Sequence, residues 1–332
     1  MLSFAGMPEL APILFFGTPE FAVPTLAALV EAGRVPARVV TQPARPVGRG
    51  RQLQDPPVAA WARERGLEVA QPERVRHPGF LEDVAALEPG VAVVVAFGQI
   101  FPRALLDLPR HGCINLHASL LPRWRGASPI QAAVAAGDSR TGVATLLMEE
   151  GLDTGPILLE EETEIGPEET ADELSRRLAG MGGALMVKTL DRLERGDLVP
   201  RPQPAEGATY APRLTRESGR VDWSLTAREI HDRLRAYTPW PGLTSVLRGE
   251  PVKIVSAAVL GDGLGDGLGD GLGDGETAEP GTILGLRDGR LAVACGGGSV
   301  FGVAELQRPG KRALRAADFV NGERLRPGES FS

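Results

Sequence analysis

The sequence predicts an α/β protein in which a doubly wound parallel sheet is followed by a small β-barrel. Short apolar runs alternate with helix-like stretches from residue 13 to residue 193. A break rich in proline follows at residues 200–209, and short strand-like runs with glycine-rich turns fill the remainder. Strands that alternate with helices are typical of parallel sheets, whereas closely spaced short strands are typical of small barrels.

The N-terminal part begins with an apolar strand and continues as alternating helices and strands. Residues 13–17 are the first strand, and the Thr18-Pro19 pair then gives a helix-start signal before the periodic stretch 21–30. Residues 91–97 are almost continuously apolar, as expected of a strand buried on both faces. The remaining predicted strands are residues 37–41, 66–70, 114–117, 142–148 and 157–164, and the remaining helices are residues 58–65, 81–87, 130–136 and 171–193. In such a Rossmann-like sheet, functional groups gather at the carboxyl ends of the strands.

The C-terminal part contains one helix, at residues 226–236, and five short strands. The strands are predicted at residues 243–247, 252–258, 281–286, 291–294 and 299–305. Five such strands predict an OB-like barrel, a fold that often binds nucleic acid. A Gly-Asp-Gly-Leu repeat at residues 261–275 interrupts them, and we expect a flexible loop there. The predicted division is a catalytic domain at 8–200, a linker at 201–209 and a barrel at 210–330.

Composition favours a cytoplasmic protein, and we expect a monomer. With 42% hydrophobic and 24% charged residues, the chain has an ordinary globular composition. The longest apolar run, residues 91–97, is too short to span a bilayer, and the N-terminus lacks a signal-peptide pattern. Cys113 and Cys295 are far apart and have no metal-binding or redox spacing. We therefore expect no membrane association and no metal.

Basic residues are concentrated in a few segments, although the net charge is −7. Residues 34–51 contain five arginines and no acidic residue, and a second acid-free cluster lies at residues 308–315. Arg213 stands close to two further arginines. Local positive patches on an acidic protein are compatible with nucleic-acid binding on one face.

The strongest chemical signal is the strand 114–117 together with the turn 151–155. Side chains alternate between the two faces of a strand, so Asn115 and His117 share a face. Asp153 lies in the turn Gly-Leu-Asp-Thr-Gly. Taken singly, His117 is a typical structural histidine and Asp153 a typical turn former. Together, an amide donor, an imidazole and a carboxylate are the groups needed to transfer a carbonyl carbon to an amine.

These motifs resemble the signature of the folate-dependent formyltransferases. The resemblance rests on Asn115-x-His117, on the run Ser-Leu-Leu-Pro-Arg-Trp-Arg-Gly-Ala at 119–127, and on the turn 151–155. It implies the formyltransferase fold, with 10-formyltetrahydrofolate as formyl donor, tetrahydrofolate as product and no metal. Folate-binding or RNA-binding without catalysis is the rival from another class, and the complete set of polar residues argues against it. A dinucleotide site fails because Gly17 is the only glycine of the first turn.

The acceptor is indicated by the flanking chain. Residues 17–22, 41–53, 208–214 and 309–319 are similar to the family members that formylate methionyl-tRNA. The resemblance implies transfer to the α-amino group of initiator methionyl-tRNA, which gives N-formylmethionyl-tRNA for translation initiation. A small amine such as a UDP-aminosugar is the alternative acceptor. Ala44 stands where these relatives usually carry aspartate, so a contact from that carboxylate is absent.

The resemblance also implies three sets of site residues. Asn115 and protonated His117 would donate hydrogen bonds to the oxyanion, and Asp153 would hold the imidazolium. The folate-binding set is Ser119, Leu120, Leu121, Pro122, Phe97, Gly98, Gln99 and Ile100. The tRNA-binding set is Arg45, Arg49, Arg51, Arg213, Arg308, Lys311 and Arg312.

Overall fold

The computed structural model describes residues 10–47, 52–261 and 278–332 and divides into two compact units. Unit 1 contains the chain up to Pro129 together with residues 140–164 and 173–212. Unit 2 contains residues 130–139, 165–172 and 213–332. The predicted insert at 261–275 lies outside the described residues apart from Gly261.

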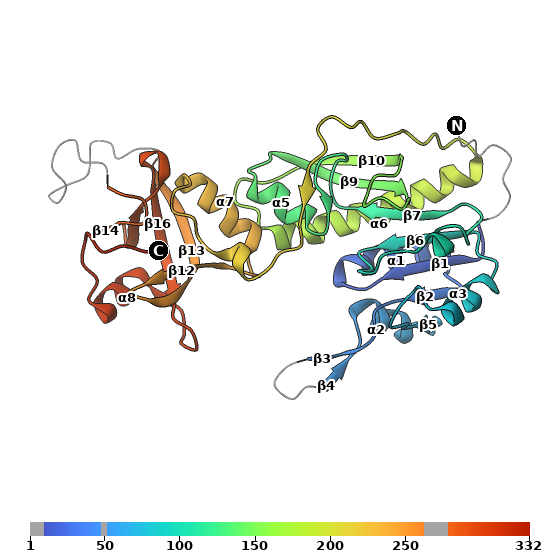
Figure 1. Ribbon diagram of the computed structural model, residues 1–332, viewed down its shortest axis with the longest axis horizontal. Helices are drawn as coiled ribbons and strands as arrows, with labels where there is room; N and C mark the ends of the chain where they lie inside the picture. Colours follow the sequence, from blue (N-terminus) through green and yellow to red (C-terminus); the bar gives the residue numbers. More distant parts are fainter. Residues whose placement is uncertain (1–9, 48–51, 262–277) are drawn as a thin grey trace. The chain divides into compact units, whose positions relative to one another are not determined.

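Unit 1 is built on a seven-stranded sheet with the strand order β10-β9-β7-β6-β1-β2-β5 (Figure 1). The strands are β1 (Ile13–Gly17), β2 (Arg38–Val40), β5 (Val69–Ala70), β6 (Val91–Val95), β7 (Cys113–His117), β9 (Arg140–Leu147) and β10 (Ile157–Glu164). The first five pair with one another in parallel, so the α/β Rossmann-like fold is confirmed. The expectation of an entirely parallel sheet is wrong at one edge, where β9 is antiparallel to both β7 and β10. The connection from β9 to β10 contains no helix, and strands joined so directly pair antiparallel.

Helices cover both faces of this sheet, and their packing determines which way the side chains of β7 point. They are η1 (Glu20–Ala22), α1 (Val23–Glu31), α2 (Pro57–Glu64), α3 (Pro78–Ala85), α4 (Arg103–Leu106) and α6 (Ala171–Arg195). Leu116 packs against α6 at Gly182, whereas Cys113 belongs to the apolar cluster on the other face. Because Asn115 and His117 alternate with Leu116, the strand directs them away from α6.

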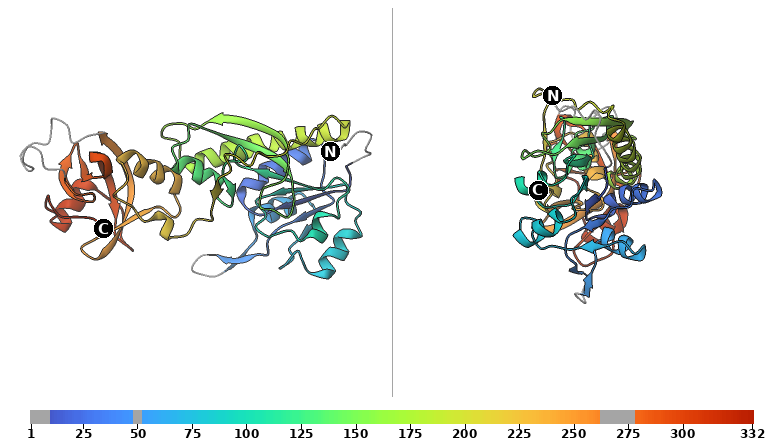
Figure 2. Two further views of the ribbon diagram at one scale, coloured as in Figure 1. Left: turned by 45° about the horizontal axis from the view of Figure 1, so that its top comes forward. Right: turned by 90° about the vertical axis from the view of Figure 1, so that its right-hand side faces the viewer.

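Two short pairings complete unit 1. Strands β3 (Arg45–Val47) and β4 (Gln52–Gln54) form an antiparallel hairpin that extends away from the sheet (Figures 1 and 2). Strands β8 (Arg125–Gly126) and β11 (Tyr210–Ala211) pair in parallel. The second pairing brings the chain after residue 200 beside the segment that follows β7.

Unit 2 contains an antiparallel sheet with the order β12-β13-β16-β15-β14, and β17 pairs with β16. Its elements are α5 (Pro129–Ala135), η2 (Glu217–Gly219), α7 (Ala227–Tyr237), β12 (Leu243–Leu247), β13 (Glu250–Gly261), β14 (Ile283–Arg287), β15 (Arg290–Ala294), η3 (Gly296–Gly298), β16 (Val300–Gln307), β17 (Leu314–Arg315) and α8 (Ala316–Glu323). The five predicted strands are confirmed. The helix α7 begins one residue after the predicted start, because Thr226 is its N-cap and forms a capping box with Glu229. The core includes Trp223, whose ring contacts both Phe301 and Phe331.

Candidate active site

Three polar side chains, two from β7 and one from a later turn of unit 1, meet at the carboxyl end of β7. The Asn115 Nδ2 atom lies 3.4 Å from Asp153 Oδ1, and the His117 Nδ1 atom lies 3.7 Å from Asp153 Oδ2. The His117 side chain is 6% exposed and that of Asp153 13% exposed, so water screens their interaction weakly. The structure therefore brings together the three residues singled out for catalysis.

The orientation of the His117 ring is fixed by a backbone carbonyl. The Nε2 atom lies 2.9 Å from the carbonyl oxygen of Trp124. A carbonyl oxygen only accepts hydrogen bonds, so this contact requires a hydrogen on Nε2. The opposite ring nitrogen, Nδ1, faces Asp153. A hydrogen that His117 contributes to a substrate must therefore be carried on Nδ1.

The carboxylate of Asp153 has a backbone partner as well. Its Oδ2 atom accepts a hydrogen bond of 2.8 Å from the Gly126 N–H. Gly126 has φ = +114°, and a Cβ atom there would lie 2.6 Å from the Ala211 carbonyl oxygen, so glycine is required. Asp153 itself has φ = +52°, a conformation that few non-glycine residues adopt.

The segment that follows β7 carries the first half of the predicted folate set. Ser119 is buried, and its hydroxyl donates a 2.6 Å hydrogen bond to the Arg123 carbonyl. Leu121 belongs to a core cluster that includes Ala144 of β9, and Leu120 packs over Gly142 of the same strand. Pro122 is half-buried. Ser119 and Leu121 thus have structural contacts within the fold.

The second half of that set lies just after β6. The Phe97 ring is buried edge-to-face against Phe16 and Phe101, and its carbonyl oxygen accepts hydrogen bonds from the Thr18 and Gln42 side chains. In contrast, Gly98 is exposed and the Ile100 side chain is 90% exposed. The Gln99 side chain holds the loop between β5 and α3, because it accepts a 2.9 Å hydrogen bond from the backbone N–H of residue 75.

The predicted tRNA-binding residues are distributed over both units. Arg45 is exposed at the start of the β3–β4 hairpin of unit 1, whereas Arg49 and Arg51 lie outside the described residues. Arg213, Lys311 and Arg312 of unit 2 are exposed. Within the described ranges, their side chains have neither an ion pair nor a hydrogen bond.

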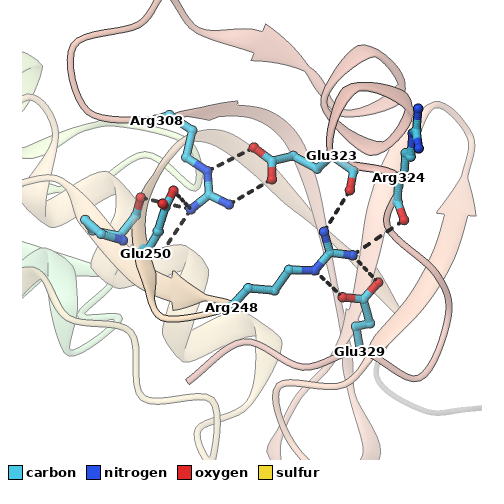
Figure 3. A network of polar contacts seen from close by, with 7 residues as sticks. Arg248, Glu250, Arg308, Glu323, Arg324 and Glu329 are labelled. Carbon is cyan, nitrogen blue, oxygen red and sulfur yellow. Dashed lines mark hydrogen bonds and ion pairs between the residues drawn. The ribbon is translucent and has the colours of Figure 1, made fainter.

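Arg308 differs from these residues because its guanidinium is engaged by the fold (Figure 3). It donates to both carboxylate oxygens of Glu323 at 3.1 Å and to the carbonyl oxygens of Glu250 and Pro251 at 3.0 and 3.2 Å. Its side chain is 13% exposed. The hydrogen bond from Arg308 also lowers the pKa of the Glu323 carboxyl. A pocket of about 620 Å³ lies beside this pair, with Lys311 and Arg312 among its lining residues.

Two residues of the segment predicted as a linker also contact the site. The Gln203 side chain donates to the backbone carbonyls of Asp153 and Gly155, both at 2.7 Å. The Thr209 hydroxyl accepts a 2.8 Å hydrogen bond from the Trp124 N–H. The sequence did not reveal either residue. No local pattern connects Gln203 with a turn some fifty residues earlier, or Thr209 with a backbone N–H 85 residues earlier.

In the described ranges, no group of three or more His, Cys, Asp or Glu side chains is placed to hold a metal ion. Among the helices of the same ranges, none has the length and apolarity needed to cross a membrane.

Comparison with known proteins identifies the family. The family model for formyl transferases matches residues 11–190, and that for the formyl transferase C-terminal domain matches residues 213–324. The methionyl-tRNA formyltransferase of Citrifermentans bemidjiense is 46% identical over 95% of this chain and 95% of its own length. The enzyme of the same name from Acidobacterium capsulatum is 48% identical over 95% of this chain and 97% of its own.

A solved structure shows the same fold at low sequence identity. The N-formyltransferase of Helicobacter canadensis, in complex with folinic acid and dTDP-3-aminofucose, has a TM-score of 0.63 and 16% identity. The match covers 88% of this chain and 98% of that one. Because these relatives are 46% and 48% identical over nearly the full length of both chains, the chain belongs to the methionyl-tRNA formyltransferase family.

Proposed function

We propose that Asn115, His117 and Asp153 carry the transfer of the formyl group from 10-formyltetrahydrofolate to the α-amino group of initiator methionyl-tRNA. The product, N-formylmethionyl-tRNA, serves translation initiation. The observation that supports these roles is the position of the Asp153 carboxylate. From a turn more than thirty residues away, it contacts both Asn115 and His117 of β7.

The reaction needs stabilisation of an oxyanion and transfer of one proton. The free amine attacks the formyl carbon, and the carbonyl oxygen becomes negatively charged. Asn115 has one amide hydrogen directed to Asp153 and a second available for this oxygen. Protonated His117 shares its Nδ1 hydrogen between Asp153 and this oxygen, because Nε2 is used by Trp124. Donors held in place before the reaction need no reorganisation when the charge develops.

The intermediate then collapses toward products. The bond between the formyl carbon and the folate nitrogen breaks, and the new carbon–nitrogen bond to methionine remains. The attacking nitrogen loses a proton and the folate nitrogen gains one, through Asp153 and the adjacent His117. The carboxylate is suited to this role because its Oδ2 is anchored by Gly126 while Nδ1 of the imidazole faces it.

Folate binding is assigned to the segments that follow β6 and β7. The exposed Gly98 and Ile100 offer backbone and apolar surface, and Leu120 and Pro122 are half-buried beside the catalytic strand. Four further residues of the proposed set have side chains that make contacts inside the fold: Phe97, Gln99, Ser119 and Leu121. We propose that they contribute to folate binding through their backbone atoms and by shaping these segments.

Acceptor binding is assigned to exposed basic residues in both units. Arg45 belongs to the hairpin of unit 1, for which Arg49 and Arg51 remain predictions. Arg213, Lys311 and Arg312 supply cations for phosphate contacts in unit 2. Arg308 is retained in this set as the residue that supports the wall of the pocket, because its own donors are occupied.

The C-terminal sheet is proposed to close as an OB-like barrel through the last residues of the chain. Phe331 bridges Leu247 of β12, and Ser330 bridges Thr282 beside β14. The tail therefore contacts both edge strands of the sheet. We also propose the domain division 8–200, 201–209 and 210–330, a monomer and a cytoplasmic location.

The decisive assay offers three amines to one enzyme. Formyl transfer from 10-formyltetrahydrofolate is measured with initiator methionyl-tRNA, elongator methionyl-tRNA and an aminosugar nucleotide. Initiator methionyl-tRNA is expected to react fastest, whereas preference for the aminosugar would overturn the acceptor assignment. His117→Ala tests the chemistry, with exposed His77→Ala as its control. Full activity of His117→Ala would refute the proposed catalytic role.

A further inference from the structure

The amide of Gln203 makes four hydrogen bonds, and all of them connect parts of the active-site region. Its Nε2 donates to the carbonyl oxygens of Asp153 and Gly155 at 2.7 Å each. Its Oε1 accepts from Arg125 Nε at 3.0 Å and from Arg125 Nη2 at 2.7 Å. The side chain thus joins the catalytic turn to the segment that follows β7.

These partners determine the orientation of the amide. Arginine can only donate and carbonyl oxygens can only accept, so Oε1 must face Arg125 and Nε2 must face the turn. All four positions of the amide are then satisfied. Glutamate, of nearly the same shape, would keep the contact with Arg125 but would direct a carboxylate oxygen at two carbonyl oxygens. Glutamine is therefore the residue that this arrangement requires.

The turn held by Gln203 is closely packed, and its Asp153 side chain reaches the other two polar residues of the site only through long contacts. A Cβ atom at Gly155 would lie 1.7 Å from the Leu147 carbonyl oxygen, so the turn is pressed against the end of β9. Asp153 reaches Asn115 and His117 across 3.4 and 3.7 Å. Contacts of this length are at the limit of a polar interaction, so a small shift of the turn would remove them.

The segment after β7 that contains Arg125, and the segment 203–209, also contact the Asp153 carboxylate and the backbone beside His117. Gly126, next to Arg125, donates to the carboxylate of Asp153. Thr209 accepts from the N–H of Trp124, whose carbonyl fixes His117. The segment 203–209 therefore contacts both the backbone that presents the carboxylate and the backbone that orients the imidazole.

We propose that Gln203 is a positioning residue for catalysis, which acts by fixing the Asp153 turn through its bridge to Arg125. The proposal rests on the proposed role of Asp153. Gln203→Leu is expected to lower kcat about 10- to 100-fold, because displacement of a catalytic group by about 1 Å can cost two orders of magnitude. The KM for methionyl-tRNA is expected to stay unchanged, and the midpoints of the kcat–pH profile are expected to move because the carboxylate–imidazole distance changes.

Two further variants separate positioning from folding. Gln203→Glu preserves shape and is expected to lose activity as Gln203→Leu does. Arg201→Leu is the matched control, because Arg201 lies in the same segment but pairs with Glu160 of β10; its kcat and pH profile should match those of the unaltered enzyme. Circular dichroism and the melting temperature are measured for each protein. Full kcat in a folded Gln203→Glu protein would overturn the proposal.

A double-mutant cycle with Asp153→Asn identifies the residue through which Gln203 acts. If it acts through Asp153, Gln203→Leu adds little to the loss already caused by Asp153→Asn. Losses that multiply would mean that Gln203 acts elsewhere, which contradicts the inference. If Asp153→Asn alone keeps full activity, the proposed catalytic set fails instead, so the two failures are distinguishable.

Discussion

Asp153 in unit 1 and Arg308 in unit 2 are charged side chains of equal exposure, 13%, and both are enclosed by specific partners. Lys311 and Arg312 stand only a few residues from Arg308, yet they are exposed, and their side chains have no polar partner in the part of the chain that the structure describes. Position in the sequence therefore does not separate a structural cation from one available to a ligand; the contacts do.

The difference fits what each region is proposed to bind. An oxyanion is stabilised by donors fixed in advance, so the groups around Asp153 are held by one another and by backbone atoms. A polyanion is bound by exposed cations whose interaction with phosphate releases counterions, so occupied donors contribute little there. Arg308 resembles the catalytic cluster in its contacts, although the sequence places it among basic residues.

The largest effect is expected for the loss of a catalytic donor. Asn115→Ala should lower kcat about 10²–10³-fold, as removal of one oxyanion donor does in other enzymes. The KM for methionyl-tRNA should change little, because the proposed role of Asn115 toward the substrate is limited to the reacting formyl group. Steady-state kinetics measure both constants. A raised KM with normal kcat would place Asn115 with the binding residues and break the comparison.

The next effect concerns stability in unit 2. Arg308→Ala leaves the Glu323 carboxylate and the carbonyl oxygens of residues 250 and 251 without their donor. A partly buried acceptor without its donor destabilises the folded state, so the free energy of unfolding should fall by about 1–3 kcal/mol. Urea denaturation measures it, and exposed Lys311→Ala is the control. Equal stabilities of the two variants would contradict the structural role of Arg308.

A smaller effect is expected for the exposed cations. Lys311→Ala and Arg312→Ala should each weaken tRNA binding and reduce the slope of log K against log salt by about one. Filter binding at several salt concentrations measures this slope. Stability and kcat should remain normal. An unchanged slope would remove the residue concerned from the tRNA-binding set.

The smallest effect is expected for His231, a buried histidine of unit 2 that lies near the Glu168 carboxylate. Burial lowers the pKa of His231 below its usual 6.5, and Glu168 at 3.3 Å opposes this only partly. The unfolded chain then binds a proton that the folded chain resists, so the contribution of His231 to stability is present above pH 6.5 and is lost as the pH falls. His231→Gln should therefore destabilise the protein less at pH 5.5 than at pH 8. A pH-independent difference in unfolding free energy would contradict this.

Much of the fold was predictable because its elements are strongly patterned. The strand β1 and the start of α6 agree with the predicted ranges, since an apolar run and a long periodic stretch are local signals. Short elements were missed, among them α4, β17 and the β8–β11 pair. A two-residue strand exists only because a partner lies beside it, so its own residues carry no signal.

The sequence by itself determined which groups the enzyme has and that Asn115 and His117 share one face, because alternation along a strand is a local property of the backbone. Tertiary structure decided that Asp153 meets them, that Gln203 holds its turn, and that Arg308 is occupied while Lys311 is exposed. These contacts join residues that are distant along the chain. Their geometry depends on the path of the whole backbone and cannot be read from any short segment.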